Sequence, residues 1–253
     1  MITNNVSIDI IIPVKERYKL LLKALNSIEK QSLKPNKVWI IDDCSTEKID
    51  NFPKFTFKIE IIRNIINRGP SYSCNLGAHA SNAKYIAIIE TDDLWSNTKL
   101  SKQYELAKKK DLDFVYCNYS NNKKKNTQKL SNNKNLIFEL LLNRWSCPNP
   151  STFFFKRSSF ININGFDENM IGTHDHDLWM KISQSNLKID YVNEYLVEIE
   201  DYNQDQMSRD YKTRIKSIKY FTSKHKDLIV KSKGIEYFNY YKQELISRAL
   251  IPC

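Results

Sequence analysis

The sequence predicts an α/β fold in which helices flank a mostly parallel, doubly wound sheet, with a helical basic appendage at the C-terminus. Short β-branched runs alternate with amphipathic segments through the first half of the chain, and this alternation is typical of parallel strand–helix–strand units. The chain has 253 residues, of which 41% are hydrophobic, so it can bury the core of one large domain.

The expected strands of the first half are short and rich in Ile and Val. They are residues 8–14, 38–42, 58–63, 85–91 and 114–119. Between them, apolar residues at helical spacing predict helices at 19–31, 71–81 and 97–110. Strands joined by helices in this way pair in parallel through right-handed connections, which gives the predicted sheet.

The second half is less regular. Residues 120–135 are rich in Asn and Lys, which predicts a solvated loop. Beyond it we expect helices at 136–144 and 175–184, and strands at 151–156, 189–192 and 195–200. The chain therefore divides into one domain, residues 1–205, with halves at 1–119 and 136–205, and a C-terminal segment, residues 206–253.

The C-terminal segment is strongly basic. From residue 211 onward, ten Lys and Arg residues stand against three acidic ones, within a net charge of +10 for the whole chain. Aromatic and aliphatic residues lie between these charges. This pattern fits a helical pair that packs on the core with a solvated basic face, and equally a segment that lies on an anionic membrane surface.

Composition limits the compartment and the partners. The sequence has no run of roughly 20 apolar residues, the length of a membrane span, and its first residues lack the features of a signal peptide. We therefore expect a cytoplasmic protein, or one on the inner face of the cytoplasmic membrane. The five cysteines include no CxxC pair, which favours reduced thiols. The charge is compatible with nucleic acid, anionic lipid or phosphate-bearing molecules.

Acidic residues follow the ends of the expected strands, at Glu16, Asp42, Asp43, Glu90, Asp92 and Asp93. The carboxyl ends of parallel strands line the crevice in which ligands bind. Clustered carboxylates suit a hard cation such as Mg²⁺ or Mn²⁺. Each acidic pair taken alone is more often a helix cap or turn former, but the coincidence at successive strand ends favours a metal site.

Phosphate, if it binds here, needs other partners than a glycine-rich loop. The sequence lacks both GxGxxG and GxxxxGK[ST], which argues against the usual dinucleotide fold and a P-loop. A metal at Asp92 and Asp93 can neutralise a diphosphate.

In the second half, the run His174 to Asp177 fits a metal site, but helical neighbours two apart diverge. We favour a carboxylate base beside the indole of Trp179, since sugars stack on aromatic rings.

Several ordered motifs resemble family 2 glycosyltransferases of the GT-A fold, over about three quarters of the chain. IIDDCST (residues 40–46) resembles the family's VDDGSTD, and YIAIIETDDLW (85–95) resembles its YIxxLDxDD. IIIPVKER (10–17), NRGPSYSCNLGAHAS (67–81) and GFDENMIGTHDHDLWMKI (165–182) resemble its opening strand, its NxGxxxARNxG segment and its acceptor-side segment GFDE…EDxDLWLR. The resemblance implies a Rossmann-like, mostly parallel sheet.

The resemblance also implies site residues. Contacts to a nucleotide, uracil by likeness, are implied for Pro13, Val14, Glu16, Asp42, Asp43 and Asp92. Asp93 is implied as the ligand of Mn²⁺ or Mg²⁺, and Asp175 as the catalytic base. Trp179 and His174 are implied to lie near the acceptor.

Three departures from the family pattern stand out. Cys74 replaces the usual Arg of the NxGxxxARNxG segment, so that one phosphate or base contact is either missing or supplied by Arg68. Glu90 replaces the first acid of DxDD, and His174 replaces the acid before the base. An imidazole in place of a carboxylate is expected to alter the acceptor preference or the pKa of Asp175.

The resemblance implies an inverting, metal-dependent glycosyltransferase. It would move a hexose or N-acetylhexosamine from a UDP-sugar to a saccharide hydroxyl, in bacterial lipopolysaccharide, O-antigen or capsule assembly, with an acceptor that can be linked to a lipid diphosphate. The alternatives are a nucleotidyltransferase, which shares the cleft and metal, and a nucleic-acid-binding module, which rests on the basic tail. Because the predicted ligand edge is acidic, we do not expect nucleic acid as a partner.

Overall fold

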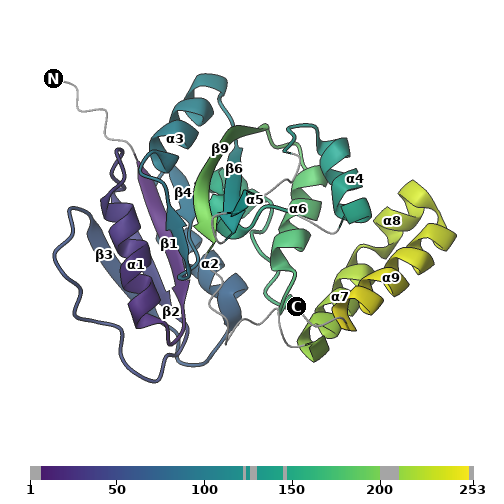
Figure 1. The fold of residues 1–253 in the computed structure, drawn as a ribbon, viewed down its shortest axis with the longest axis horizontal. Coiled ribbons are helices and arrows are strands. Elements are labelled where there is room, and N and C mark those ends of the chain that lie inside the picture. The colour runs from purple at the N-terminus through teal and green to yellow at the C-terminus, as the bar shows by residue number, and fades with distance from the viewer. Residues whose placement is uncertain (1–6, 122–123, 126–129, 145–146, 200–210, 251–253) are drawn as a thin grey trace.

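The computed structural model describes residues 7–121, 124–125, 130–144, 147–199 and 211–250. Its centre is a mixed sheet with helices on both faces (Figure 1). In the described residues the sheet has nine strands, ordered β3-β2-β1-β4-β8-β6-β9-β5, with β7 paired to β6. The prediction of an α/β fold with a mostly parallel sheet flanked by helices is confirmed.

The first half forms the parallel part of the sheet. β1 (Ile8–Val14), β2 (Lys37–Asp42), β3 (Lys58–Arg63) and β4 (Tyr85–Ile88) pair in parallel, close to the expected ranges. α1 (Tyr18–Glu29), α2 (Gly69–Ala80) and α3 (Lys99–Lys110) connect or follow these strands. Buried residues of α1 and α3 form one core on one face of the sheet, and those of α2 join the core on the other.

Close packing of α2 on the sheet depends on Gly77. A Cβ atom at this position would lie 2.6 Å from Cγ2 of Ile11 in β1, well inside van der Waals contact. The glycine therefore allows the helix to approach the strand closely. That approach sets the position of the N-terminus of α2, next to the end of β2.

The second half adds the antiparallel part of the sheet. β8 (Phe154–Lys156) lies antiparallel to both β4 and β6 (Phe114–Asn121). β9 (Ile189–Ile199) pairs in parallel with β6 and antiparallel to β5 (Asp93–Trp95). The remaining elements are the short strand β7 (Lys124–Lys125), the helices α4 (Lys134–Arg144), α5 (Arg157–Asn162) and α6 (His174–Gln184), and the 3₁₀ turn Pro150–Thr152.

Several details differ from the sequence predictions. The strand expected at 85–91 ends at Ile88, and β5 was not predicted. The two short strands expected at 189–192 and 195–200 are one strand, which follows β6 through register shifts beside Cys117 and Asn118. β6 and β7 extend into the expected loop at 120–135, and α5 was not anticipated. The expected strand at 151–156 begins with the 3₁₀ turn. A propensity pattern alone does not reveal a bulge that keeps a strand continuous.

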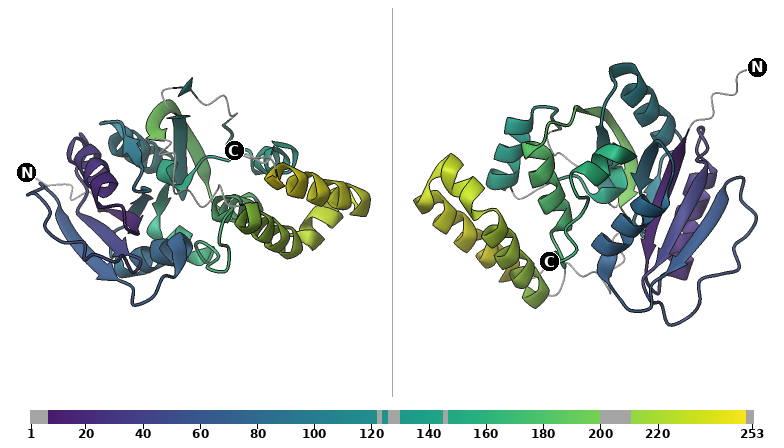
Figure 2. Two further views of the ribbon diagram at one scale, coloured as in Figure 1. Left: turned by 60° about the horizontal axis from the view of Figure 1, so that its bottom comes forward. Right: turned by 180° about the vertical axis from the view of Figure 1, so that it is seen from behind.

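The C-terminal segment forms α7 (Tyr211–Lys224), α8 (Lys226–Lys233) and α9 (Ile235–Leu250), rather than a pair of helices. They lie beside α4 and α6, at the opposite end of the molecule from β3 (Figures 1 and 2). Phe221, Phe238 and Leu245 share a core cluster with Leu141 of α4 and Trp179 of α6. The expected boundary at 205–206 lies outside the described residues. None of the helices described here is long and apolar enough for a membrane span.

Candidate active site

Acidic side chains from both halves of the chain come together at one edge of the sheet. β4 ends at Ile88, and the chain turns through Glu90 and Asp92 into β5, which begins with Asp93. Burial raises the pKa of Glu90 well above its usual value, and Asp93, Asp92 and Asp175 raise it further. Asp92, Asp93 and Asp175 each act electrostatically on Glu90. We call Glu90, Asp92 and Asp93 the acidic edge, and Asp175 of α6 lies beside it.

Asp93 is held by the segment that precedes β8. Its side chain is 1% exposed, and its Oδ2 atom accepts hydrogen bonds from Asn149 Nδ2, at 2.8 Å, and from the Ser151 hydroxyl. The same hydroxyl accepts a 2.9 Å hydrogen bond from the backbone N–H of Glu90. Asn149 and Ser151 therefore fix the turn that carries the acidic edge, and sequence spacing did not identify either residue.

Asp92 lies beside a cation from the first motif. Nη1 of Arg17 donates a 2.6 Å hydrogen bond to Oδ2 of Asp92. Burial and the neighbouring carboxylates raise the pKa of Glu90, and the charge of Arg17 opposes part of this rise. Arg17 thus offsets part of the negative charge of the acidic edge. Its position at the end of IIIPVKER is the sequence signal that could have identified it.

The donor atoms of the acidic edge are of the type that a hard divalent cation prefers. All are carboxylate oxygens, the ligand type that Mg²⁺ and Mn²⁺ prefer. The mutual repulsion that raises the pKa of Glu90 is the repulsion that a bound cation removes. Asp93 as a metal ligand therefore stays a prediction that rests on the ligand type.

Asp42 closes β2 and is 1% exposed. It accepts hydrogen bonds from Nη1 of Arg63, at 3.0 Å, and from the backbone N–H of Ser45, at 2.9 Å. Pro13 and Val14 are buried at the end of β1, where Val14 pairs with Asp42. These contacts fix the position of the carboxylate at the carboxyl edge of β1 and β2.

Glu16 lies on the exposed side of the same edge. Its Oε1 atom accepts hydrogen bonds of 2.7 Å from the backbone N–H and the hydroxyl of Thr46, and these bonds lower its pKa. The backbone of Glu16 has a φ of 61°, a left-handed conformation that few residues other than glycine adopt. The loop after β1 is thereby tied to the loop after β2.

Asp43 caps α2. Its oxygens accept hydrogen bonds from the backbone N–H groups of Arg68, at 2.8 Å, and Gly69, at 2.6 Å, and from the Asn64 side chain, at 2.8 Å. A carboxylate at this place satisfies the N–H groups that open a helix. The helix-cap alternative holds for Asp43, and we assign it no nucleotide contact.

Arg68 lies apart from the acidic edge, whereas Cys74 is buried near Glu90, whose charge adds to the effect of burial and raises the pKa of the thiol. The guanidinium of Arg68 stacks on the ring of Tyr72, at 4.0 Å from its centroid, and lies 3.8 Å from the Glu168 carboxylate. Cys74 is 4% exposed and belongs to the core beneath α2. The side chain of Cys74 therefore supplies packing, and the structure gives no contact between Arg68 and the residues of the acidic edge.

Asp175 is in the first turn of α6. Its Oδ1 atom accepts a 2.9 Å hydrogen bond from the backbone N–H of His176. The same oxygen lies 3.0 Å from Nδ1 of the His176 ring. The Cys147 thiol donates to Oδ2 at 3.6 Å. Burial raises the pKa of Asp175, but His176 and His174 outweigh it, so that the pKa lies well below its usual range. The carboxylate is therefore ionised at neutral pH.

Tyr119, which sequence reasoning missed, lies near the same carboxylates. Burial raises its pKa to about 12, with further contributions from Cys147, Asp175 and Asp93. The phenol is therefore protonated at neutral pH and can donate a hydrogen bond. Its position in β6 gave no sequence signal, because Tyr is common in strands of any function.

His174 and Trp179 are packed more tightly than expected of acceptor residues. The ring of His174 meets Phe166 edge-on, with centroids 5.4 Å apart, and burial lowers its pKa. Trp179 is 1% exposed and packs edge-on against Tyr116 and Phe153. The structure corrects the expectation that this indole stacks on a sugar, because neither face is accessible. Its Nε1–H donates to the carbonyl of Pro148 at 2.9 Å, next to Asn149.

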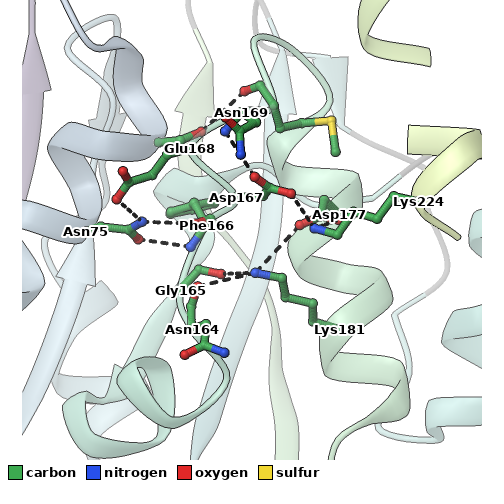
Figure 3. A network of polar contacts seen from close by, with 12 residues as sticks. Asn75, Asn164, Gly165, Phe166, Asp167, Glu168, Asn169, Asp177, Lys181 and Lys224 are labelled. Carbon is green, nitrogen blue, oxygen red and sulfur yellow. Dashed lines mark hydrogen bonds and ion pairs between the residues drawn. The ribbon is translucent and has the colours of Figure 1, made fainter. Parts of the chain in front are cut away.

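A polar clamp joins α2 to the loop before α6. The side chain of Asn75 donates to the carbonyl of Phe166, at 2.9 Å, and accepts from its backbone N–H, at 2.9 Å (Figure 3). Gly165 has a φ of +40°, and a Cβ atom there would lie 2.3 Å from Oδ1 of Asn75. The conformation at Gly165 therefore requires glycine. The two hydrogen bonds hold the acceptor-side segment (165–182) against the segment at 67–81.

Asp177 joins α6 to the C-terminal helices. Its fully buried carboxylate lies 2.7 Å from Nζ of Lys224 and 2.8 Å from Nε2 of His225. Lys224 also reaches Asp167, at 2.6 Å (Figure 3). The run His174 to Asp177 thus separates into two tasks: Asp175 faces the acidic edge and Asp177 anchors α7 and α8.

The fold, together with the acidic residues at the carboxyl ends of its strands, places this chain in the class of α/β proteins to which glycosyltransferases belong. Residues 9–167 match the family described as Glycosyl transferase family 2, and the chain belongs to this family. An uncharacterized glycosyltransferase of Rickettsia bellii is 28% identical over 195 residues. That match covers 74% of this chain and 28% of the relative, so the chain spans less than a third of the relative's length.

Two solved structures share the fold at low sequence identity. TarS of S. aureus, in complex with UDP-GlcNAc, has a TM-score of 0.63 at 15% identity, covering 96% of this chain and 71% of that one. The mannosyltransferase PcManGT of Pyrobaculum calidifontis, in complex with GDP-Man and Mn²⁺, has a TM-score of 0.61 at 14% identity, covering 96% and 72%. The expected GT-A fold is confirmed.

Proposed function

We propose that this chain is a metal-dependent, inverting glycosyltransferase that moves a hexose or N-acetylhexosamine from a UDP-sugar to a saccharide hydroxyl. The observation that carries the proposal is that Asp93 and Asp175 both lie near enough to Glu90 to raise its pKa. These residues come from separate halves of the chain. A carboxylate suited to a base thus lies beside carboxylates suited to a cation, as a displacement at a sugar carbon with a diphosphate leaving group requires.

Asp93 would hold the Mn²⁺ or Mg²⁺ ion, with Glu90 and Asp92 adding negative charge around it. When bound, the ion would neutralise charge that develops on the leaving diphosphate. Asn149 and Ser151 orient Asp93 through hydrogen bonds. Arg17 pairs with Asp92 at 2.6 Å, and its guanidinium would supply a second positive charge to the diphosphate. PcManGT, which shares the fold, carries Mn²⁺ in its complex.

Asp175 would accept the proton of the acceptor hydroxyl as that oxygen attacks. Its low pKa keeps the carboxylate ionised, and His176 fixes its orientation through a 3.0 Å contact. One base is enough for a single displacement, and a single displacement inverts the anomeric centre. Inversion therefore follows from the assignment of one base.

The donor nucleotide would bind over the ends of β1 and β2. Asp42 and Glu16 present carboxylates there, held by Arg63 and Thr46, and Pro13 and Val14 form the floor of this edge. A carboxylate can accept hydrogen bonds from the N–H group of uracil or from ribose hydroxyls. The UDP-GlcNAc bound to TarS is consistent with a uridine donor.

The acceptor would be a saccharide of a surface polysaccharide such as lipopolysaccharide, O-antigen or capsule, including a saccharide that is linked to a lipid diphosphate. The basic C-terminal helices support this choice of acceptor. Lys212, Lys216 and Lys219 of α7 line a groove of about 370 Å³. We propose that these lysines contact the inner face of the cytoplasmic membrane, where each cation near an anionic surface contributes about 1 kcal/mol.

The experiment that tests the proposed activity replaces the base. Asp175→Asn should lower kcat for UDP-sugar transfer by about 10²- to 10⁴-fold and leave the donor KM nearly unchanged, because the base acts in the transition state. Asp50→Asn, at an exposed carboxylate outside the acidic edge, is the control and should keep the parent rate. Release of UDP is the measurement, and an unchanged kcat in Asp175→Asn would remove the assignment.

A further inference from the structure

A sulfur, a nitrogen and a carboxylate meet at the N-terminus of α6. Cys147 lies between α4 and the 3₁₀ turn, and Asp175 and His176 are in the first turn of α6. One ligand atom from each of the three residues lies within 4.8 Å of the others. Two contacts are shorter: Sγ of Cys147 is 3.6 Å from Oδ2 of Asp175, and Nδ1 of His176 is 3.0 Å from its Oδ1.

We propose that Cys147, Asp175 and His176 form a binding site for a thiophilic divalent cation of the zinc type, distinct from the hard-cation site at Asp93. Zinc binds sulfur at about 2.3 Å and carboxylate oxygen at about 2.0 Å, so that a tetrahedral site separates these atoms by roughly 3.5 Å. The 3.6 Å distance from Sγ to Oδ2 already matches this separation. Water or an acceptor oxygen would complete the coordination.

The ligand types separate the two sites. The acidic edge offers carboxylate oxygen alone, which suits Mg²⁺ or Mn²⁺, whereas thiolate and imidazole select softer ions. All three side chains of the zinc-type site are partly exposed, so an ion can reach them. Binding would release the thiol proton to solvent, because thiolate is the form that coordinates metal.

The site has a consequence that rests on the proposed function. Asp175 is the proposed base, and a cation bound to its oxygen would prevent it from accepting the acceptor proton. A zinc-type ion would therefore inhibit transfer at a concentration at which Mn²⁺ or Mg²⁺ supports it. The chain would thus carry an inhibitory metal site that uses the catalytic carboxylate.

The first experiment measures metal binding without turnover. Co²⁺ added to the whole chain should give the near-ultraviolet thiolate-to-cobalt absorption band, and Zn²⁺ should remove it in a 1:1 titration. Cys147→Ser should lose the band, and His176→Gln should weaken Co²⁺ affinity by at least about tenfold. Cys44→Ser, at a partly exposed thiol in the loop after β2, should keep both. A full band in folded Cys147→Ser would overturn the site.

The second experiment measures inhibition. Zn²⁺ should inhibit UDP release in the parent and in Cys44→Ser, and Cys147→Ser should need at least about tenfold more Zn²⁺ for the same inhibition. Equal inhibition of all three proteins would contradict the proposed consequence. If no variant transfers sugar, the proposed function fails, but the cobalt titration still decides whether the metal site exists. Thermal unfolding of each variant shows that it is folded.

Discussion

Uncharged side chains help to orient the carboxylates of the acidic edge. The hydroxyl of Ser151 is fully buried and contacts both the Asp93 carboxylate and the backbone of Glu90. A buried donor or acceptor that loses its partner costs about 1–3 kcal/mol. The orientation of Asp93 therefore depends on a residue that carries no charge itself.

Removing this hydroxyl should weaken both stability and metal binding. We expect Ser151→Ala to lower the free energy of unfolding by about 1–3 kcal/mol and to weaken Mn²⁺ binding, as measured by urea unfolding and calorimetry. Ser183→Ala is the matched control, since Ser183 is also buried but bonds only within α6. Unchanged Mn²⁺ affinity in Ser151→Ala would mean that Asp93 is oriented by other groups.

Residue identities could be predicted from sequence only where a motif carries them. The strand-end position of Asp42 is confirmed by the structure, because period and β-branched composition locate strand ends. Asp93 instead begins β5, a strand that the sequence did not predict. Ser151 could not be linked to Asp93, which lies 58 positions away, since side-chain pairing over such a distance leaves no local pattern. The helix-cap role of Asp43 and the burial of Trp179 likewise depend on tertiary packing.

At the scale of elements, α6 connects the proposed chemistry to the C-terminal helices. Asp175 at its start faces the acidic edge, and Asp177 is bound by Lys224 and His225. Lys181 of α6 lies 3.7 Å from the same carboxylate. Removing one partner of a buried ion pair costs about 3–5 kcal/mol, so Asp177 is a main attachment point of α7 and α8.

This attachment should weaken in acid. Burial raises the pKa of Asp177, but the bonds from His225 and Lys224 outweigh it and hold the pKa below the usual 3.8. A lowered pKa stabilises the folded state above pH 3.8, and this contribution is lost as the pH falls through the folded pKa. Asp167, bound to Lys224, also has a lowered pKa and adds to the loss.

Hydrogen exchange can measure this acid dependence. Amide protection in α7–α9 should fall as the pH is lowered below about 4, the usual pKa of a carboxyl group. It should fall before the protection in β1 and β2 does. Asp177→Asn should show lower protection at neutral pH and a smaller dependence on acid. Equal protection of the helices and the sheet at every pH would show that the core contacts of α7–α9 alone hold them.

The arrangement of elements was predictable in the first half and less so in the second. Parallel strands separated by helices produce a regular alternation, and β1, β2, β3 and β4 lie near their expected positions. β9 follows β6 through register shifts, which interrupt the pattern that sequence reading relies on. The three C-terminal helices share one basic composition, so their number was not apparent from charge.

At the scale of the whole molecule, charge is divided between an acidic edge and basic C-terminal helices. We expect the chain to sediment with anionic vesicles and not with neutral ones, and salt to reduce this binding, because exposed charges are screened. A triple replacement of Lys212, Lys216 and Lys219 by Gln should lower vesicle binding. The same replacement of Lys108, Lys109 and Lys110 in α3 is the control for net charge. Equal loss in both would indicate non-specific attraction.

The central claim is that the acidic edge binds a nucleotide through a divalent cation. The direct measurement is the thermal unfolding of the parent and of Asp93→Asn with UDP, GDP, CMP or ADP, each with and without Mn²⁺. Binding to the folded state stabilises it by about 2.7 kcal/mol at a ligand concentration one hundred times Kd. We expect UDP to raise the Tm of the parent only in the presence of Mn²⁺, and this rise to be lost in Asp93→Asn. No rise with any nucleotide in the presence of Mn²⁺ would contradict it.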